Sequence, residues 1–272
     1  MDVLTLLGVA FAIWLMLAAF MAGAWAVEQR TGNSGWVDVT WTAALGTTGI
    51  LGAFAVLDPA DVTGRQWLVA ALVLGWALRL AAHIAWRTAN VSDDPRYKKL
   101  RAEWGASAPA KMLWLLQAQA ILSVPMVLSS VLAAWNPAPL FSWIDIVAIS
   151  VFVIGLAGSA VADWQLSQFK RVAKDTGRVC NVGLWSWSRH PNYFFEWLVW
   201  VGLALLAIDM SGEWLWGLIA LGGPVCMYWL LRFVSGVPPL EEHMLAKYGD
   251  RYARYQQETS SFFPLPPVRH GI

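Results

Sequence analysis

One segment combines side chains that can bind an anion with the start of an apolar helix. Residues 183–200 read Gly-Leu-Trp-Ser-Trp-Ser-Arg-His-Pro-Asn-Tyr-Phe-Phe-Glu-Trp-Leu-Val-Trp. Proline suits a first helical turn, and free backbone N–H groups there, beside Arg189 and His190, would attract a phosphate. Asn192 and Glu196 are four residues apart, so both project from one helical face. The segment therefore predicts an anion site, with interfacial anchoring of the two basic residues as the structural alternative.

A second set of polar residues lies inside an apolar stretch. Arg79, His83 and Arg87 recur every four residues and would form one stripe along a helix. A charged group in the middle of a bilayer costs about 2.5–3.5 kcal/mol even on lenient scales. The stripe therefore predicts a buried polar cavity that accepts an anion or a carbonyl group. The alternative is that Arg87 reaches the membrane surface and Arg79 pairs with a buried acid.

Two carboxylates near the ends of apolar stretches could also be functional. Asp38 lies close to the start of one stretch, where it could either favour the helix N-terminus or face the cavity. Asp163 follows another stretch and shares a helical face with Lys170 and Arg171. The basic residues could meet anionic lipid headgroups, whereas Asp163 is the type of residue that binds ribose hydroxyls.

The composition places these residues in a membrane protein. Of the 272 residues, 58% are hydrophobic and 14% are charged, against roughly a quarter charged in a typical soluble domain. The formal net charge of +1 gives no field that would attract nucleic acid. Two cysteines are too few for a disulfide scaffold, and no Cys-x-x-C pair indicates a metal site.

Seven stretches approach the length of about 20 apolar residues that a bilayer requires. They are Val3–Val27, Trp36–Leu57, Trp67–Trp86, Met112–Trp135, Trp143–Ala162, Tyr193–Ile208 and Trp214–Val234. With seven spans, every Lys and Arg except Arg65 and Arg79 falls on or next to one side. The positive-inside rule then places the N-terminus outside and the C-terminus in the cytoplasm. The expected fold is an all-α polytopic bundle of about seven transmembrane helices.

The cytoplasmic segments hold most of the polar residues. The last of them, Leu240–Phe263, reads as one amphipathic helix with an aromatic stripe at Tyr248, Tyr252 and Tyr255. The outer loops are short and turn-like, such as the one containing Asp58 and Pro59. A water-soluble ligand is therefore expected to enter from the cytoplasmic face.

These motifs resemble the C-terminal domain of the steroid 5-alpha-reductase-like membrane proteins. The resemblance rests on the Gly-Leu-Trp … Ser-Arg-His-Pro-Asn-Tyr-x-x-Glu run and covers about residues 145–267. Three further stretches are similar to the bacterial branch of that family. They begin at Asp94, Ala162 and Glu241, and the last continues to Pro264. Sterol reductases and isoprenylcysteine-type methyltransferases share the Arg-His-Pro core, whereas Asn192-Tyr193 and Glu196 look more like the reductases.

The resemblance implies a single membrane domain over residues 1–272 that binds NADPH from the cytoplasm. Helices of residues 1–140 would line a substrate cavity, and residues 141–267 would bind the cofactor. The implied cofactor residues are Arg87, Asp163, Lys170, Arg189, His190, Asn192, Tyr193, Glu196, Glu242 and Tyr248. By the resemblance, the family's carbonyl-binding glutamate would fall near Asp38, and its tyrosine falls near His83, where this chain has no Tyr. Asp38 and His83 are therefore the expected catalytic pair.

The expected activity is hydride transfer from NADPH to the C=C bond of a hydrophobic α,β-unsaturated carbonyl. The substrate, steroid-like or isoprenoid-like, would enter from the bilayer, and the expected location is the bacterial inner membrane. An S-adenosylmethionine-dependent lipid or isoprenylcysteine-type methyltransferase on the same scaffold is the alternative. Neither a metal nor an obligatory protein partner is expected. No Gly-x-Gly-x-x-Gly motif occurs, which excludes the common soluble nucleotide-binding fold.

Overall fold

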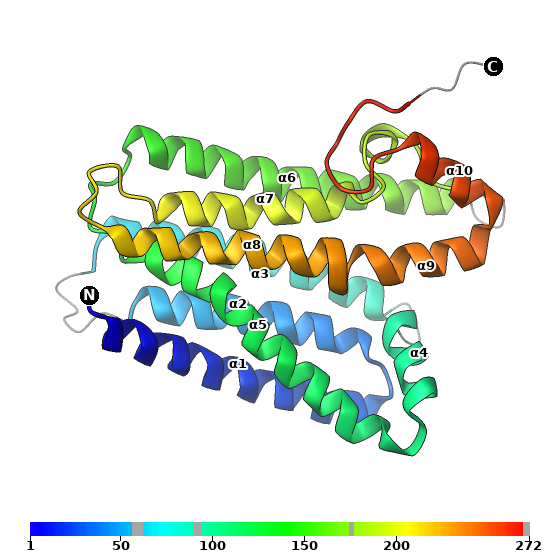
Figure 1. Cartoon of the computed structure of the whole chain (residues 1–272), viewed down its shortest axis with the longest axis horizontal. Coiled ribbons are helices and arrows are strands. Elements are labelled where there is room, and N and C mark those ends of the chain that lie inside the picture. The colour runs from blue at the N-terminus through cyan, green and yellow to red at the C-terminus, as the bar shows by residue number, and fades with distance from the viewer. Residues whose placement is uncertain (56–61, 90–93, 174–176, 269–272) are drawn as a thin grey trace. The chain divides into compact units, whose positions relative to one another are not determined.

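In a computed structural model of the protein, the described residues form helices joined by loops, and no strand occurs among them. The described residues are 1–55, 62–89, 94–173 and 177–268, and the structural statements below refer to them (Figure 1). The expected outer turn at Asp58 and Pro59 lies outside the described residues. The fold class predicted from the composition and the apolar stretches is confirmed in its coarse form, an all-helical chain.

The α-helices are α1 (Val3–Thr31), α2 (Gly35–Ala53), α3 (Gly64–Ala89), α4 (Pro95–Trp104), α5 (Ala108–Ala134), α6 (Trp143–Val172), α7 (Pro191–Leu206), α8 (Gly222–Trp229), α9 (Val237–Tyr248) and α10 (Asp250–Glu258). Short 3-10 turns are η2 (Gly105–Ser107), η3 (Gly183–Ser186) and η4 (Leu215–Leu221), and η5 (Leu230–Val234) is a π-helix.

Local sequence signals explain several helix ends. The Asp2 side chain accepts a hydrogen bond of 2.7 Å from the backbone N–H of Thr5 at the start of α1. At the other end, Gly32 adopts a φ of +67°, and its N–H reaches the carbonyl of Glu28. Asp94 caps α4 in the same manner as Asp2 caps α1, with a proline in the first turn.

Five helical stretches are long and apolar enough to cross a membrane, which indicates a multi-pass integral membrane protein. They are Val3–Thr31, Gly64–Ala89, Arg96–Ala134, Trp143–Val172 and Leu215–Tyr248. On α3, Trp67 and Trp86 are 65% and 63% exposed and lie about 28 Å apart along the helix axis. This separation matches a hydrocarbon core of about 30 Å with tryptophans at both interfaces. The two shorter helices, α2 and α7, are not in this set, although the sequence predicted both as spans.

The last predicted span, Trp214–Val234, is not one regular α-helix. It consists of η4, α8 and the π-turn η5, in which the N–H of Ser235 bonds to the carbonyl of Leu230. Pro238 and Pro239 have no N–H to donate, so they lie in the first turn of a new helix, α9.

The expectation of one helix over Leu240–Phe263 is wrong. Two helices, α9 and α10, meet at Gly249, which has a φ of +54° that non-glycine residues rarely adopt. Beyond Glu258 the chain is extended rather than helical. The three tyrosines of the predicted stripe therefore belong to two helices.

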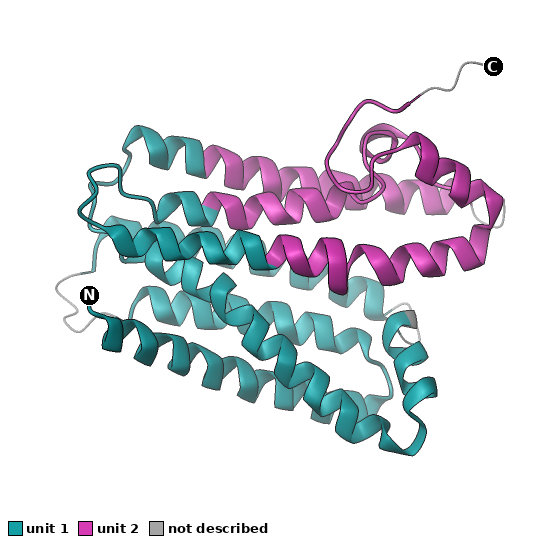
Figure 2. Ribbon diagram, in the orientation of Figure 1, with its two compact units in different colours: residues 1–148, 203–226 teal, residues 149–202, 227–272 magenta. Residues whose placement is uncertain are grey.

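The chain divides into two compact units (Figure 2). Unit 1 comprises residues 1–148 and 203–226, and unit 2 comprises residues 149–202 and 227–272. Residues 203–226 thus belong to the same compact unit as residues 1–148.

Close helix packing stabilises each unit. In unit 1, α2 packs on α3, and a Cβ added at Gly46 would lie 2.5 Å from the Cβ of Ala77. In unit 2, a Cβ added at Gly155 on α6 would lie 2.8 Å from the carbonyl oxygen of Phe195 and from the nitrogen of Val199 on α7. Glycine at these positions lets the helix backbones approach each other, as is common in membrane proteins.

Candidate functional site

The segment that carries the predicted anion site is held in unit 2 on the end of α6. The turn η3 begins at Gly183, with a φ of +59°, and the next N–H, that of Leu184, bonds to the side chain of Gln165 at 2.9 Å. The indole of Trp185 donates to the carbonyl of Ala162, also at 2.9 Å. Helix α7 then begins at Pro191, as the sequence predicted.

Arg189 connects this turn to the C-terminal segment. Its Nε lies 2.7 Å from Oε1 of Glu241 on α9, and Nη1 donates to the carbonyl of Gln256 at 2.9 Å. Nη1 also donates to the carbonyl of Thr259. The Arg189 side chain is only 9% exposed. Arg189 therefore links the turn before α7 to the C-terminal segment, and it also carries positive charge.

His190 shares the same carboxylate. Its Nε2 lies 3.1 Å from Oε1 of Glu241, and its ring stacks on that of Tyr193 with an interplanar angle of 6°. Burial lowers the pKa of His190 below its usual 6.5, against the opposing influence of Glu241. Nδ1 is buried and has no hydrogen-bond partner among the described residues. A buried nitrogen of this kind is a potential contact for a ligand.

Two of the predicted cofactor residues lie together. The amide of Asn192 on α7 donates to Oδ1 of Asp163 on α6 at 3.2 Å. Glu196, one turn beyond Asn192, is 7% exposed. The pairing of Asn192 with Asp163 places a carboxylate, which can accept a hydrogen bond from a hydroxyl group, beside an amide, which can accept from or donate to one.

The segment after α10 covers the basic turn. The N–H of Arg189 bonds to the carbonyl of Ser260 at 2.8 Å, and the hydroxyl of Ser188 donates to the carbonyl of Phe262 at 2.8 Å. The buried hydroxyl of Tyr255 donates to the carbonyl of Trp185. In Figure 1 this red segment loops past the turn that precedes α7. The tail thus fixes the turn through backbone groups.

Glu241 is the central residue of this cluster, whereas the family resemblance implies its neighbour Glu242. Glu242 is exposed, whereas Glu241 contacts both Arg189 and His190. Neighbouring residues on a helix point about 100° apart, so only one of the two glutamates can face the turn. Lys170 is exposed and Tyr248 is half-buried, and the structure brings neither into the Glu241 cluster by a hydrogen bond among the described residues.

The predicted catalytic residue Asp38 lies in unit 1, in the first turn of α2. Its carboxylate forms an ion pair with Arg96 on α4, and Oδ1 lies 3.4 Å from the hydroxyl of Tyr97. Gln119 donates to the same hydroxyl at 3.2 Å. No hydrogen bond joins Asp38 to His83 within the described part of the chain. The structure therefore supplies a tyrosine beside Asp38 that sequence spacing did not reveal.

Arg96 joins Asp38 to a second carboxylate, that of Asp94. It contacts Asp94 at 3.0 Å, and Nη2 of Arg87 lies 3.8 Å from the same carboxylate. Hydrogen bonds from Arg96, together with its charge, hold the pKa of Asp94 below its usual value despite burial. Arg87 is 48% exposed and pairs with Asp94. The polar stripe of α3 thus ends in a network of two acids and two arginines.

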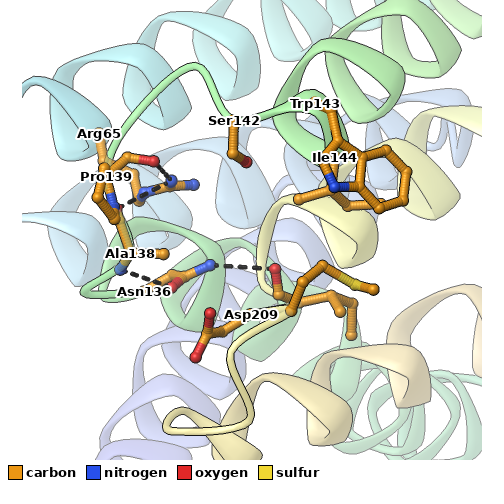
Figure 3. Close-up of a pocket in the computed structure, with 10 residues that line it drawn as sticks. Arg65, Asn136, Ala138, Pro139, Ser142, Trp143, Ile144 and Asp209 are labelled. Atoms are coloured by element: carbon orange, nitrogen blue, oxygen red, sulfur yellow. Dashed lines mark hydrogen bonds between the residues drawn. The ribbon is translucent and has the colours of Figure 1, made fainter.

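A separate pocket of about 140 Å³ lies in unit 1 at the start of α3 and α6 (Figure 3). Arg65 lies on its wall and forms a buried ion pair with Asp145, Nη1 to Oδ1, at 2.8 Å. The same guanidinium donates to the carbonyls of Leu206, Ala138 and Pro139 at 3.1–3.2 Å. Both terminal nitrogens of Arg65 are thus engaged in hydrogen bonds. Arg65 therefore has a structural role at this pocket, where it holds loop carbonyls together.

The fold and these two polar clusters define an all-helical, multi-pass membrane protein with a buried Arg-His-Glu cluster in unit 2. The chain belongs to the DUF1295 family of proteins of unknown function, which it matches over residues 24–259 and which is associated with steroid 5-alpha-reductase-like proteins.

A curated protein is similar to part of this chain. The uncharacterized protein C594.04c of Schizosaccharomyces pombe is 33% identical over 99 residues, which is 36% of this chain and 27% of the yeast protein. The chain thus matches about a quarter of the length of that relative. No solved structure matches the chain significantly.

Proposed function

We propose that the protein is an NADPH-dependent reductase of the C=C bond in a hydrophobic α,β-unsaturated carbonyl compound. The observation that carries the proposal is the grouping of Arg189, His190, Asn192 and Asp163 at the start of α7. The grouping combines positive charge with hydroxyl-binding groups, which is what a phosphorylated nucleotide requires. The resemblance of the same segment to steroid 5-alpha-reductase-like proteins supports the proposal.

The residues of unit 2 fit such a cofactor. The backbone N–H groups in the first turn of α7 would face a phosphate, and Asp163 and Asn192 would bind ribose hydroxyls. The unpartnered Nδ1 of His190 would accept a hydrogen bond from an N–H or O–H group of the cofactor. By the resemblance, further contacts would come from Lys170, Tyr193, Glu196 and Tyr248 of the same unit. The bound cofactor supplies a hydride, and the protein supplies orientation and charge stabilisation.

The residues around Asp38 would hold the substrate carbonyl. Asp38 is ion-paired with Arg96 and so would act as an acceptor rather than as an acid. The buried hydroxyl of Tyr97, which donates to Asp38 in this structure, would donate to the carbonyl oxygen instead when substrate binds, and would stabilise the enolate as negative charge develops. His83, half-buried on α3, remains the second proposed donor.

Cofactor preference tests this proposal. Thermal unfolding of the detergent-purified protein is measured with NADPH, NADH and S-adenosylmethionine in separate samples. A ligand at 100 times its Kd adds about 2.7 kcal/mol of stability, which shifts the midpoint visibly. We expect a shift with NADPH. A shift with S-adenosylmethionine alone would contradict the reductase proposal and favour the alternative function, a methyltransferase.

A pair of variants tests the location of the site. Asn192→Ala removes the amide that contacts Asp163, and Asn181→Ala removes an exposed amide of the same unit. We expect N192A to lose the NADPH shift while keeping its ligand-free midpoint within a few degrees, and N181A to keep both. An unchanged NADPH shift in N192A would place the cofactor elsewhere.

A further inference from the structure

The end of α6 carries an apolar groove that neither the proposed cofactor site nor the substrate site uses. The groove has a volume of about 300 Å³. Its walls are formed by Trp164, Gln165, Gln168, Phe169 and Val172 on α6, and by Val182 and Gly183. We propose that this groove binds one anionic phospholipid of the surrounding membrane.

The depth of the groove in a membrane follows from the tryptophans of α6. Trp143 and Trp164 are 62% and 61% exposed and lie about 32 Å apart along the helix axis. This distance matches the hydrocarbon core, with each indole at an interface. The groove begins at Trp164 and continues toward Val172 for about 12 Å along the helix axis. It therefore lies in the layer that contains the glycerol and headgroup of a lipid.

The rim of the groove is basic. Arg171 is exposed and falls in the same helical row as Trp164 and Gln168, at spacings of four and three residues. The guanidinium of Arg178 lies 6.0 Å from the ring centre of Phe169, a wall residue. Two exposed arginines at the headgroup level are complementary to a phosphate that carries negative charge.

Polar groups inside the groove suit the ester region of a lipid. The amide of Gln168 forms no hydrogen bond with another described residue, and Gln165 uses its oxygen to hold the N–H of Leu184 at 2.9 Å, which leaves its NH2 group as a donor. The rest of the wall is aromatic or aliphatic. A free phosphate ion would gain nothing from this apolar wall, whereas a phospholipid matches both the wall and the rim.

Native mass spectrometry of the full chain in detergent tests the proposal. The probes are phosphatidylglycerol, phosphatidylcholine with the same acyl chains, and inorganic phosphate. We expect one phosphatidylglycerol to be retained in preference to phosphatidylcholine. Each cation near an anionic headgroup contributes about fivefold in affinity, so Arg171→Gln with Arg178→Gln should weaken binding about 30-fold.

Two further variants separate the wall from the rim. Gln168→Trp fills the groove without removing charge and should also weaken phosphatidylglycerol binding. Lys98→Gln with Lys111→Gln removes the same charge from exposed positions of unit 1 and should leave binding unchanged. Undiminished lipid binding in the Arg171/Arg178 variant overturns the proposal. So does equal retention of the two lipids, or competition by inorganic phosphate, which would indicate a simple anion site.

Discussion

The carboxylate of Glu241 lies 2.7 Å from Nε of Arg189, although 52 residues separate the two in sequence. The same oxygen also contacts Nε2 of His190 at 3.1 Å. A single acid on α9 therefore pairs with the charge of Arg189 and also orients the ring of His190.

Replacing Glu241 should destabilise unit 2. Glu241→Gln leaves the nearly buried Arg189 without its ion-pair partner, which we expect to cost about 2–3 kcal/mol, since the pair is not fully buried. The thermal midpoint in detergent measures this loss. Glu242→Gln, on the exposed face of the same helix, should change stability by less than about 0.5 kcal/mol. Equal effects of the two variants would contradict the central position of Glu241.

Acidification should destabilise the protein through His190. Because burial lowers its pKa in the folded state below 6.5, the unfolded chain binds the proton more readily. The contribution of the neutral ring is fully present above pH 6.5 and is lost as the pH falls below that value. Thermal midpoints between pH 7.5 and 5.5 measure the slope. His190→Gln should flatten it, while replacing the exposed His243 with Gln should not.

Loss of the Tyr97 hydroxyl should reduce the proposed activity more than stability. Tyr97→Phe keeps the buried ring but removes the group that contacts Asp38, so we expect reduction of an enone to slow by about 100-fold or more. Stability should fall by only about 1 kcal/mol. NADPH oxidation, followed by absorbance with a steroid or isoprenoid enone, measures the rate. Tyr228→Phe, in an aromatic cluster of unit 2, serves as the control. A wild-type rate in Y97F would exclude this hydroxyl as the donor.

The buried pair of Arg65 and Asp145 should be needed for the integrity of unit 1. Asp145→Asn leaves a guanidinium that is 2% exposed without its counter-charge, which typically costs about 3–5 kcal/mol. The double variant Arg65→Met with Asp145→Leu removes both charges and should be less destabilised than D145N. Thermal midpoints of the three proteins distinguish a charge effect from a simple loss of packing. A double variant that is less stable than D145N would argue against the charge effect.

The amino-acid sequence by itself determined the features that depend on neighbouring residues. Apolar stretches of membrane length predicted an all-helical membrane protein, and Pro191 predicted the start of α7. Helical periodicity and helix-end preferences act over a few residues, so they can be read directly from the order of amino acids.

The tertiary structure alone decided which distant residues meet. It selected Glu241 over Glu242, because the rotation of α9 about its axis decides which carboxylate faces Arg189. It also brought Tyr97 to Asp38, across 59 residues of chain, where the family resemblance had suggested His83. Such contacts depend on how helices pack and rotate against one another, and sequence distance carries no information about that packing.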